Sequence, residues 1–537
     1  MSSRSASIAT HSTMIASTAE RREQGQETAL EGRIVSTVVE LESLAGSWRE
    51  LWNSNPNREI FQHFDFIREW IRAFGEGEGL LTPVVRARGN VIAILPLVKQ
   101  GRSVRFIGHS VSDYNDVLCA PEVANAALDT AFSTLLNVRP GAWDTIILER
   151  VREDSQLARY IREAPQWRKL IQYSAPTPCP ILTLNEEKQA LLDGILGKDK
   201  VKKTSKTIQR LGDISFRHIE SAAEIREHLA AFAEQHISRS FLEGRRSGFL
   251  RSDYRAFYQN LVEALDVSEE LRFSVLEVNG NAAAYHFGFD LGQKYLFYKP
   301  TFDIDLWDYS PGQVLLFKLL EWCRTSDTRA FDFGEGPETY KYRYANATRN
   351  NVTITLYRPD AMGRARRAVM QWLAHARTHA RQIMLDRHPK LAEWCERGMG
   401  SAKAWPKSRI QPFHDQKTAV RLNAEPLPTG DRFLKRVSLR ELSCDAAVGG
   451  ARLTPRDLQS IRERMKKGCA LYADGARRYV VLGAIVEGDP AETGNRRMVF
   501  TILQEVGSQR SRLVRELARI AEEEQMPGWL SGERKNA

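Results

Sequence analysis

The sequence predicts a mixed α/β (α+β) protein with two tandem copies of one α/β unit and a smaller C-terminal α/β unit. Along the chain, strand-like alternation of apolar residues changes repeatedly to helical spacing. Three landmarks of the first half recur in the second half at offsets of 191, 190 and 188 residues. The 537 residues also exceed what one hydrophobic core serves. These observations favour a duplicated unit over one large domain.

The first copy is expected to run through a strand, two helices, a hairpin, a third helix and a last strand. The residues Arg88-Gly89-Asn90 between two apolar runs are typical of a tight hairpin turn. The expected strands are Arg33–Glu40, Leu81–Ala87, Val91–Val98, Val104–Ile107, Val117–Cys119 and Trp143–Leu148, and the expected helices are Leu41–Trp52, Phe64–Phe74 and one from Pro121 to about Leu136.

The second copy repeats this order of elements. The expected strands are Ser215–Ile219, Arg272–Val278, Ala282–Asp290, Lys294–Tyr298, Ala330–Gly334 and Asn351–Tyr357, and the expected helices are Ala222–Ser240, Ser252–Leu265 and Gln313–Cys323. The last helix is apolar nearly all round, which predicts that it is buried on more than one side.

The two copies are aligned by a turn, a helix start and a strand residue. Gly89-Asn90 matches Gly280-Asn281, Pro121 matches Pro311, and Asp144 matches Asp332. The copies differ directly after the matched prolines, where the first has Glu122 and the second has Gly312. A carboxylate at a helix N-terminus repels phosphate, so we expect the second copy to be the one that binds an anion.

The predicted division of the chain has five parts. They are a disordered tail at 1–30 (with a transit peptide as the alternative), an N-terminal copy at 31–190, a C-terminal copy at 191–360, a basic helix and linker at 361–430, and a small α/β unit at 431–537. The last part is expected to hold strands Ala470–Tyr472, Tyr479–Val486 and Arg497–Gln504 and a helix from Ser508 to Glu524.

Charge and cysteine usage narrow the class of protein. Of the net charge of +10, residues 361–414 hold +8, from 11 Lys/Arg and 3 Asp/Glu, which argues against a nucleic-acid groove along the main body. The six cysteines lie far apart without metal spacing, and His375 and His379 lack the Glu of an H-E-x-x-H motif. We therefore expect no metal and a cytoplasmic protein without a transmembrane helix.

The stretch Ser310-Pro311-Gly312 is the strongest candidate for a ligand site. Serine is a favoured N-cap, and proline suits the first helical position. The free N–H groups of Gly312, Gln313 and Val314, with the helix dipole, would bind a phosphate or pyrophosphate. An ordinary helix start without a ligand is the alternative.

Two basic segments each have two interpretations. Lys198–Arg210 crowds one expected helix, which is either a solvated face or an edge that contacts phosphates. Arg364–Met384 is a basic amphipathic helix, which either lies on an anionic membrane surface or partner or packs on the core by its apolar stripe.

Several stretches resemble the GNAT-like acetyltransferases linked to bacterial cellulose biosynthesis, the CelD-like family. They are "KVKKTSKTIQRLGDISFRHI", "YSPGQVLLFKLLEW" and "FDFGEGPETYKYRYA" in the second copy and "FQHFDFIREWIRAF", "VIAILPL" and "VSDYNDVL" in the first. The resemblance covers about Glu31–Pro359. It implies tandem GNAT-like units and acyl transfer from acetyl-CoA, or another acyl-CoA, to an amine or hydroxyl, including a glycan precursor in exopolysaccharide metabolism.

The resemblance also implies roles for single residues. The cofactor cradle would be formed by Ser310, Gly312, Gln313 and Val314. This stretch contains a single glycine, whereas the loops of GNAT enzymes usually carry more than one. Tyr340 would protonate the leaving thiolate, Lys341 would neutralise charge, and Asp332 would be the base, with Glu335 and Asp290 as weaker candidates. Asp113, Tyr114 and Asp116 would lie on the acceptor side of a cleft, or would only stabilise a turn.

Three functions therefore stay open from the sequence. The first is an acyl-CoA-dependent transferase, favoured by the helix start and by Tyr340-Lys341. The second is a transferase resembling the Fem aminoacyl-tRNA ligases, in which Lys198–Arg210 would meet tRNA. The third is a non-catalytic scaffold of a polysaccharide synthase that 361–414 recruits to the inner face of the membrane.

Overall fold

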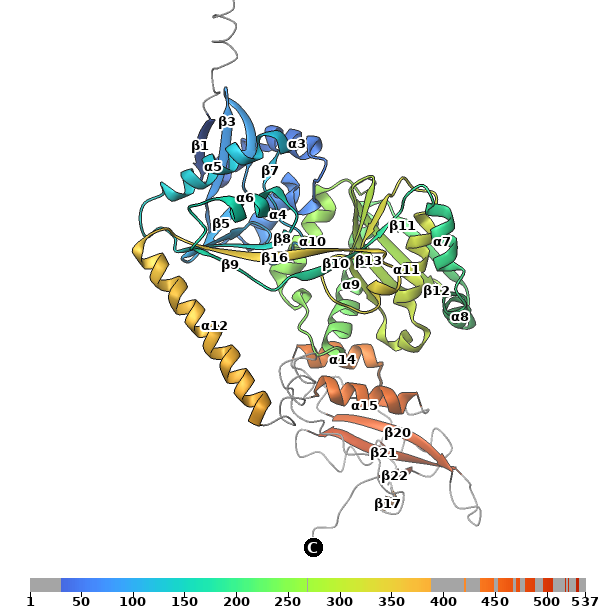
Figure 1. The fold of residues 1–537 in the computed structure, drawn as a ribbon. Helices are drawn as coiled ribbons and strands as arrows, with labels where there is room; N and C mark the ends of the chain where they lie inside the picture. Colours follow the sequence, from blue (N-terminus) through green and yellow to red (C-terminus); the bar gives the residue numbers. More distant parts are fainter. Residues whose placement is uncertain are drawn as a thin grey trace, which may run out of the picture. The chain divides into compact units, whose positions relative to one another are not determined.

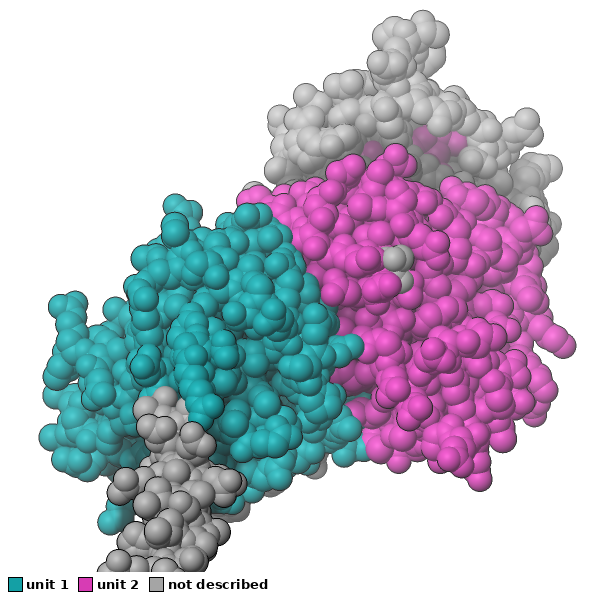
Figure 2. All heavy atoms as spheres, turned by 90° about the horizontal axis from the view of Figure 1, so that it is seen from above, with its two compact units in different colours: residues 1–180, 335–338, 348–372 teal, residues 181–334, 339–347, 373–537 magenta. Residues whose placement is uncertain are grey.

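The structure is a computed structural model and is shown in Figure 1. It describes residues 30–267, 269–387, 420–421, 435–448, 453–466, 470–473, 479–487, 496–505, 517, 520 and 528–530. The described chain forms two compact units, which Figure 2 colours separately. Unit 1 comprises residues 1–180, 335–338 and 348–372, and unit 2 comprises residues 181–334, 339–347 and 373–537.

Unit 1 contains two sheets and the helices that cover them. Its strands are β1 (Leu30–Val35), β2 (Gly79–Leu80), β3 (Thr82–Ala87), β4 (Asn90–Ile94), β5 (Leu97–Gln100), β6 (Ser103–Phe106), β7 (Leu118–Cys119), β8 (Thr145–Arg152), β9 (Ile171–Tyr173) and most of β16 (Ala347–Tyr357). Its helices are α2 (Val38–Glu42), α3 (Ala45–Ser54), η1 (Ile60–Gln62), α4 (Phe64–Phe74), η2 (Pro121–Val123), α5 (Ala124–Leu136), α6 (Gln156–Glu163) and the start of α12 (Ala361–Arg387).

The order of strands in unit 1 places α5 against a four-stranded sheet. That sheet has the order β1-β3-β4-β7 with antiparallel neighbours. In the second sheet β8 lies between β16, which is antiparallel to it, and β6, which is parallel. The apolar side of α5 contributes Ala127, Leu128, Phe132 and Leu135 to the core, where they are fully buried.

Some elements of unit 1 differ from the prediction. The expected strand Val91–Val98 is divided between β4 and β5, with Pro96 between them. The expected strand Arg33–Glu40 ends at Val35, because Thr37 and Glu40 form a capping box that starts α2. The expected helix Leu41–Trp52 is divided between α2 and α3 for the same reason. The helix Phe64–Phe74 is confirmed with the expected bounds.

Unit 2 has a five-stranded sheet extended by part of β10. Its strands are β11 (Ile214–Ile219), β12 (Leu271–Val278), β13 (Asn281–Asp290), β14 (Lys294–Phe302), β15 (Ala330–Asp332) and the last part of β10 (Thr177–Thr183). Its helices are α7 (Lys188–Leu196), α8 (Asp199–Ile208), η3 (Gln209–Leu211), α9 (Ala222–Leu242), η4 (Gly248–Leu250), α10 (Ser252–Ala264), η5 (Ile304–Tyr309), α11 (Pro311–Trp322) and η6 (Lys341–Arg343). The strands from β11 to β14 are antiparallel, and β15 is parallel to β14.

The order of elements confirms that the two units repeat one topology. The strands β1, β3, β4 and β7 of unit 1 correspond to β11, β12, β13 and β14 of unit 2, and α5 corresponds to α11. Both hairpin turns have two residues with positive φ, Arg88 and Gly89 in one and Asn279 and Gly280 in the other. These turns therefore share the backbone twist that suits a hairpin.

The third landmark does not match in the structure. Asp332 is the last residue of β15, whereas Asp144 directly precedes β8. Pro121 also opens the short helix η2 rather than α5 itself. The duplication is therefore carried by strand order and by the hairpin, not by these side chains.

Helix α11 is buried on several sides, as its apolar composition predicts. Its buried residues are Pro311, Val314, Leu315, Leu316, Phe317, Leu319 and Leu320. They share a core with Phe331 and Phe333, which follow in β15 and just after it. The packing holds the N-terminus of α11 in a defined place.

The C-terminal part of unit 2 packs on α9 and η5. Its described elements are β17 (Val420–Arg421), β18 (Lys435–Arg436), α14 (Leu439–Ala447), α15 (Pro455–Met465), β19 (Ala470–Ala473), β20 (Tyr479–Glu487), β21 (Arg496–Glu505) and β22 (Gly528–Leu530). Phe241, Leu242 and Ile304 join Leu442, Leu458 and Ile461 in one core. The Ser443 hydroxyl donates to the Ser238 carbonyl at 2.9 Å.

The compact units divide the chain differently from the predicted boundaries. The units separate at residues 180/181, not at 190/191, and most of β16, which we placed in the second copy, belongs to unit 1 because it pairs with β8 and β9. The tail 1–29, most of the linker 388–434 and most of the expected helix Ser508–Glu524 lie outside the described residues.

Candidate functional site

A cavity lies at the entrance to α11, within unit 2. Its volume is about 260 Å³, somewhat less than the roughly 300–1,000 Å³ of typical ligand pockets, so a large ligand would place only part of itself inside. It is lined by Arg239, Glu243, Phe297, Pro300, Phe302, Trp307, Ser310, Gly312, Gln313, Leu316 and Tyr340. Ser310, Gly312, Gln313 and Tyr340, which the sequence singled out, thus meet in one cavity.

Ser310 does not cap α11 as predicted. Its backbone is left-handed, with φ 54° and ψ 47°, and its side chain makes no capping hydrogen bond. A non-glycine residue in this conformation costs on the order of 1–3 kcal/mol, and such residues cluster at ligand sites. This left-handed residue connects η5 to α11, and Ser310 is one of the residues that line the cavity.

The supply of free N–H groups at α11 is smaller than predicted. The N–H groups of Gln313 and Val314 donate to the Ser310 carbonyl at 3.0 and 3.2 Å. Val314 is the fourth helical residue, so its N–H already belongs to the helical ladder. Pro311 has no N–H group. In the first turn of α11, the described backbone contacts therefore leave the Gly312 N–H as the one without a carbonyl acceptor.

Gly312 is required by close packing as well as by any ligand. A Cβ atom at this position would lie 3.0 Å from Cδ1 of the Phe302 ring. The sequence predicted a close approach of a ligand to this glycine, whereas the described neighbour is the aromatic wall of the cavity. A larger residue would therefore push on Phe302 and narrow the cavity.

Arg239 and Glu243 supply the charge of the cavity and were missed by the sequence analysis. Arg239 donates to the Pro300 carbonyl at 2.5 Å and to the Glu243 carboxylate at 3.1 Å, and it lies 5.4 Å from the Phe302 ring centroid. Burial opposes ionisation of Glu243, but Arg239 and Arg245 outweigh it and lower its pKa. The carboxylate is thus ionised, and its charge is balanced by two guanidiniums.

Tyr340 reaches the cavity from the segment after β15. It is half-buried and stands at the start of η6, with helical backbone angles. Together with Gln313 and Leu316 of α11, Tyr340 is one of the residues that line the cavity. A tyrosine hydroxyl can both donate and accept a hydrogen bond.

Lys341 and Asp332 meet at Gly334 and not at the cavity. The Asp332 carboxylate accepts the Gly334 N–H at 2.9 Å, and the Lys341 ammonium donates to the Gly334 carbonyl at 3.3 Å. Asp332 is 2% exposed and Lys341 4%. Among the described residues, the lining of the cavity includes neither Asp332 nor Lys341. Their hydrogen bonds to Gly334 instead hold the turn that leads to Tyr340.

The two weaker candidates for a base are engaged elsewhere. Glu335 contacts Arg150 at 3.4 Å and Asn351 at 2.8 Å, all within unit 1. Asp290 accepts the Gly292 N–H at 3.0 Å and contacts Arg272 at 3.3 Å. Burial raises the pKa of Asp290, although Arg272 acts against this.

Of the three loop residues of unit 1, Asp116 has the most perturbed carboxyl group. Its carboxylate accepts the Val117 N–H at 2.8 Å, and burial raises its pKa to about 7. Tyr114 is buried and packs near Phe61, and the Asp113 carbonyl accepts the Asn351 amide at 2.9 Å. These contacts fit the turn-stabilising alternative for Asp113.

The C-terminal helices hold the loop that forms one wall of the cavity. Arg462 and Lys466 contact the Asp308 carboxylate at 2.7 and 3.0 Å. The Arg462 guanidinium also lies 4.6 Å from the Trp307 ring centroid, and Trp307 packs edge-on against Phe302 at 5.2 Å. The tail, for which the sequence suggested no role, therefore supports this wall.

Tertiary contacts explain why the sequence missed these residues. Arg239 lies more than 70 positions before Gly312, and Arg462 lies about 150 after it. No spacing rule connects them, because α9 and α15 are brought to the loop by the core they share. The sequence offered only an arginine near the end of the expected helix Ala222–Ser240, which by itself does not indicate a ligand site.

The basic segments show different degrees of packing. Helix α8 buries Val201 and Ile208, and its four lysines are exposed. In α12, Met362, Val369 and Trp372 are 61%, 56% and 68% exposed, so this part of the apolar stripe is not covered by the described residues. No described helix is long and apolar enough to cross a membrane.

Comparisons with known proteins agree with the fold of unit 2. Residues 197–342 match the family model described as "Acetyltransferase (GNAT) domain", while no curated protein matches the chain. Solved structures of similar fold include FemX (TM-score 0.44, 10% identity, 58% of this chain and 96% of FemX). Others are a tandem GNAT protein from the clavulanic acid biosynthesis pathway (0.35, 13%, 60% and 98%) and a GCN5-related N-acetyltransferase from Kribbella flavida (0.30, 11%, 61% and 71%).

The matched residues 197–342 run from just before α8 to η6. They include the strained Ser310, Gly312 and Tyr340, and with them most of the cavity wall. The segment that builds the cavity therefore lies within the match to the acetyltransferase (GNAT) domain model.

Proposed function

We propose that this protein is an acyltransferase that moves an acyl group from an acyl-CoA thioester to an amine or hydroxyl. One observation carries the proposal: within the acetyltransferase match, the α11 entrance, Arg239 and Tyr340 share one cavity. This supports the proposal because a cationic group suited to an anion and a hydroxyl that can donate a proton line the same cavity.

The donor is held by positive potential at the α11 entrance. The N-terminus of this 12-residue helix presents the Gly312 N–H and the positive end of the helix dipole. Arg239, which is paired with Glu243, adds a guanidinium to the lining of the same cavity, and Ser310 adds a hydroxyl. These groups suit the pyrophosphate of CoA, with the thioester arm directed into the apolar part of the cavity.

Tyr340 is the proposed general acid. The acceptor nitrogen or oxygen forms a new bond to the thioester carbonyl carbon, and the bond from that carbon to sulfur breaks. The thiolate takes the proton of the Tyr340 hydroxyl, which is restored from the proton that the acceptor loses. Lys341 and Asp332, through Gly334, position the segment that carries Tyr340.

Asp332 as the base stays a prediction from the sequence. Its carboxylate is buried and engaged by Gly334, so it would have to act on the acceptor through a group between them. The resemblance to the CelD-like family motivates an acceptor from exopolysaccharide or cellulose metabolism, and acetyl-CoA is the donor we would test first.

Calorimetric titration of acetyl-CoA and CoA into the full chain tests the proposal. We expect binding of both, weakened tenfold or more by Arg239→Gln, because loss of a charge-assisted contact costs about 1.5–3 kcal/mol. Arg226→Gln on the same helix is the matched control, since its partner Glu263 lies on the surface. Absence of binding to the folded wild type, or equal binding in the two variants, would overturn the assignment.

A further inference from the structure

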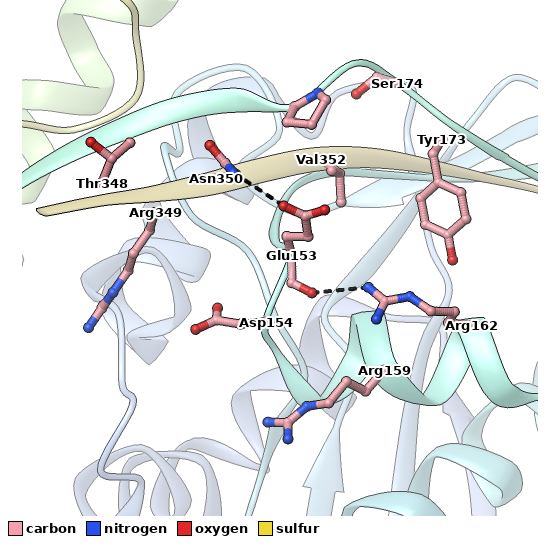
Figure 3. Close-up of a pocket in the computed structure, with 11 residues that line it drawn as sticks. Glu153, Asp154, Arg159, Arg162, Tyr173, Ser174, Thr348, Arg349, Asn350 and Val352 are labelled. Carbon is pink, nitrogen blue, oxygen red and sulfur yellow. Dashed lines mark hydrogen bonds between the residues drawn. The ribbon is translucent and has the colours of Figure 1, made fainter.

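Unit 1 contains a second, larger cavity that the acyltransferase proposal does not use. Figure 3 shows it between the end of β8, helix α6, strand β9 and strand β16. Its volume is about 900 Å³. Three arginines face it: Arg159 and Arg162 from α6, and Arg349 from β16.

None of these three arginines forms an ion pair with a described carboxylate, although, against the effect of burial, Arg152 and after it Arg349 help to lower the pKa of Asp154. Arg159 donates to the Ser155 carbonyl at 3.4 Å and Arg162 to the Glu153 carbonyl at 3.3 Å. The structure gives Arg349 no hydrogen bond or ion pair with a described side chain. Backbone carbonyls do not neutralise a guanidinium, so the charge of all three is available to a ligand.

The two acids of the cavity are already engaged. The Asp154 carboxylate forms a two-bond contact with Arg152, with both distances 3.1 Å. The Glu153 carboxylate accepts the Asn350 amide at 3.3 Å, as Figure 3 shows. Counting Arg152, the group holds four guanidiniums and two carboxylates, a balance of +2.

The remaining wall suits an organic ligand rather than a bare ion. Tyr173 is 39% exposed and presents its ring to the cavity from β9. The volume falls within the roughly 300–1,000 Å³ of small-molecule sites. An inorganic anion would fill a small part of this space.

We propose that this cavity binds an organic phosphate, whose phosphate contacts Arg159, Arg162 and Arg349. Guanidiniums bind phosphate oxygens by paired, charge-assisted hydrogen bonds. Glu153 and Asp154 accept hydroxyl groups of the attached organic part, and Tyr173 covers its face. This site does not depend on the acyl-CoA proposal, because it shares no residue with the cavity at α11.

Titration of phosphate esters into the full chain tests the site. The probes are glucose 1-phosphate and uridine diphosphate, with glucose, uridine and inorganic phosphate as references. We expect one ester to bind at least tenfold more tightly than inorganic phosphate and its unphosphorylated counterpart. Arg349→Gln and Arg159→Gln should each weaken that binding at least tenfold, while Arg349→Lys should weaken it less.

Two controls separate this site from the other. Arg139→Gln removes an exposed arginine of unit 1 outside the cavity and should leave ester binding unchanged. Arg239→Gln should weaken acetyl-CoA binding but not ester binding. Affinity that is unchanged in both cavity variants, or esters that bind no better than inorganic phosphate, would overturn the proposal.

Discussion

Helix α11 of unit 2 and its counterpart α5 of unit 1 follow strands of the same order in their sheets. The residues at the start of the two helices nevertheless differ in charge. In unit 2 the strained Ser310 leads into a 12-residue helix with Gly312 in its first turn. In unit 1 the corresponding turn is the short helix η2, which carries the exposed carboxylate of Glu122. One topology thus supports two helix starts of different charge, and we propose that only the one in unit 2 binds an anion.

The strands before these helices differ as well. In unit 2, β14 has nine residues and supplies Phe297 and Phe302 to the cavity, whereas β7 of unit 1 has two. The connection after β14 is also held by C-terminal helices. Strand order therefore does not suffice for a donor site, which also needs the local residues and the supported loop.

The largest expected effect on acetyl-CoA affinity comes from giving each helix start the residue that the other unit has at the matching position. Gly312→Glu should abolish measurable acetyl-CoA binding, because a carboxylate would oppose the helix dipole and its side chain would collide with Phe302. Calorimetry on the folded variant measures this. Glu122→Gly, the reverse change in unit 1, should leave affinity unchanged.

Gly312→Ala separates charge from crowding. It brings only a Cβ atom to 3.0 Å from Phe302, so it should weaken acetyl-CoA binding less than Gly312→Glu. Full affinity in Gly312→Glu would show that the donor does not bind at α11. Strong loss in Glu122→Gly would show that unit 1 takes part in donor binding.

A second test asks whether unit 2 is also where the chemistry occurs. Once an acceptor is known, Tyr340→Phe should lower kcat by about 10²-fold with little change in the KM for acyl-CoA, the size of a lost general acid. Tyr342→Phe, two residues later and 45% exposed, should change neither constant. Equal kcat values for both variants would remove Tyr340 from the mechanism.

A smaller effect is expected where the C-terminal helices support the loop. Arg462→Gln removes the contacts to Asp308 and Trp307 and should weaken acetyl-CoA binding about three- to tenfold. Arg456→Gln, exposed on the same helix, is the control. Unchanged affinity in Arg462→Gln would mean that the loop keeps its place without α15.

The smallest effect concerns an ionisable group of unit 1. Because the pKa of Asp116 is raised from 3.8 to about 7, the folded protein holds this proton more tightly than the unfolded chain does. Its contribution to the free energy of unfolding therefore falls as pH rises from about 4 to 7. Asp116→Asn should thus gain Tm relative to wild type between pH 5 and pH 8.

Thermal unfolding at both pH values measures this difference, with Asp327→Asn as an exposed control. A Tm difference between Asp116→Asn and wild type that is equal at pH 5 and pH 8 would contradict the raised pKa.

Much of the fold follows from local pattern. The spacing of apolar residues predicted α4, α9, α10 and α11 and the strands of unit 2 within a few residues, because helix and strand periods are local properties. The errors lie where a side chain intervenes, as where Thr37 and Glu40 end β1 early. The Ser-Pro-Gly helix start singled out Ser310 and Gly312, and the family resemblance added Tyr340.

Only the tertiary structure decided which groups surround them. In the structure Ser310 has a left-handed backbone and does not cap α11, and the N–H groups of Gln313 and Val314 donate to the Ser310 carbonyl. It also brought Arg239 to the cavity, and Arg462 to the loop that forms one wall of it, from distant parts of the chain. A sequence pattern reports the period of one element, but these contacts depend on how α9, α11 and α15 share their cores.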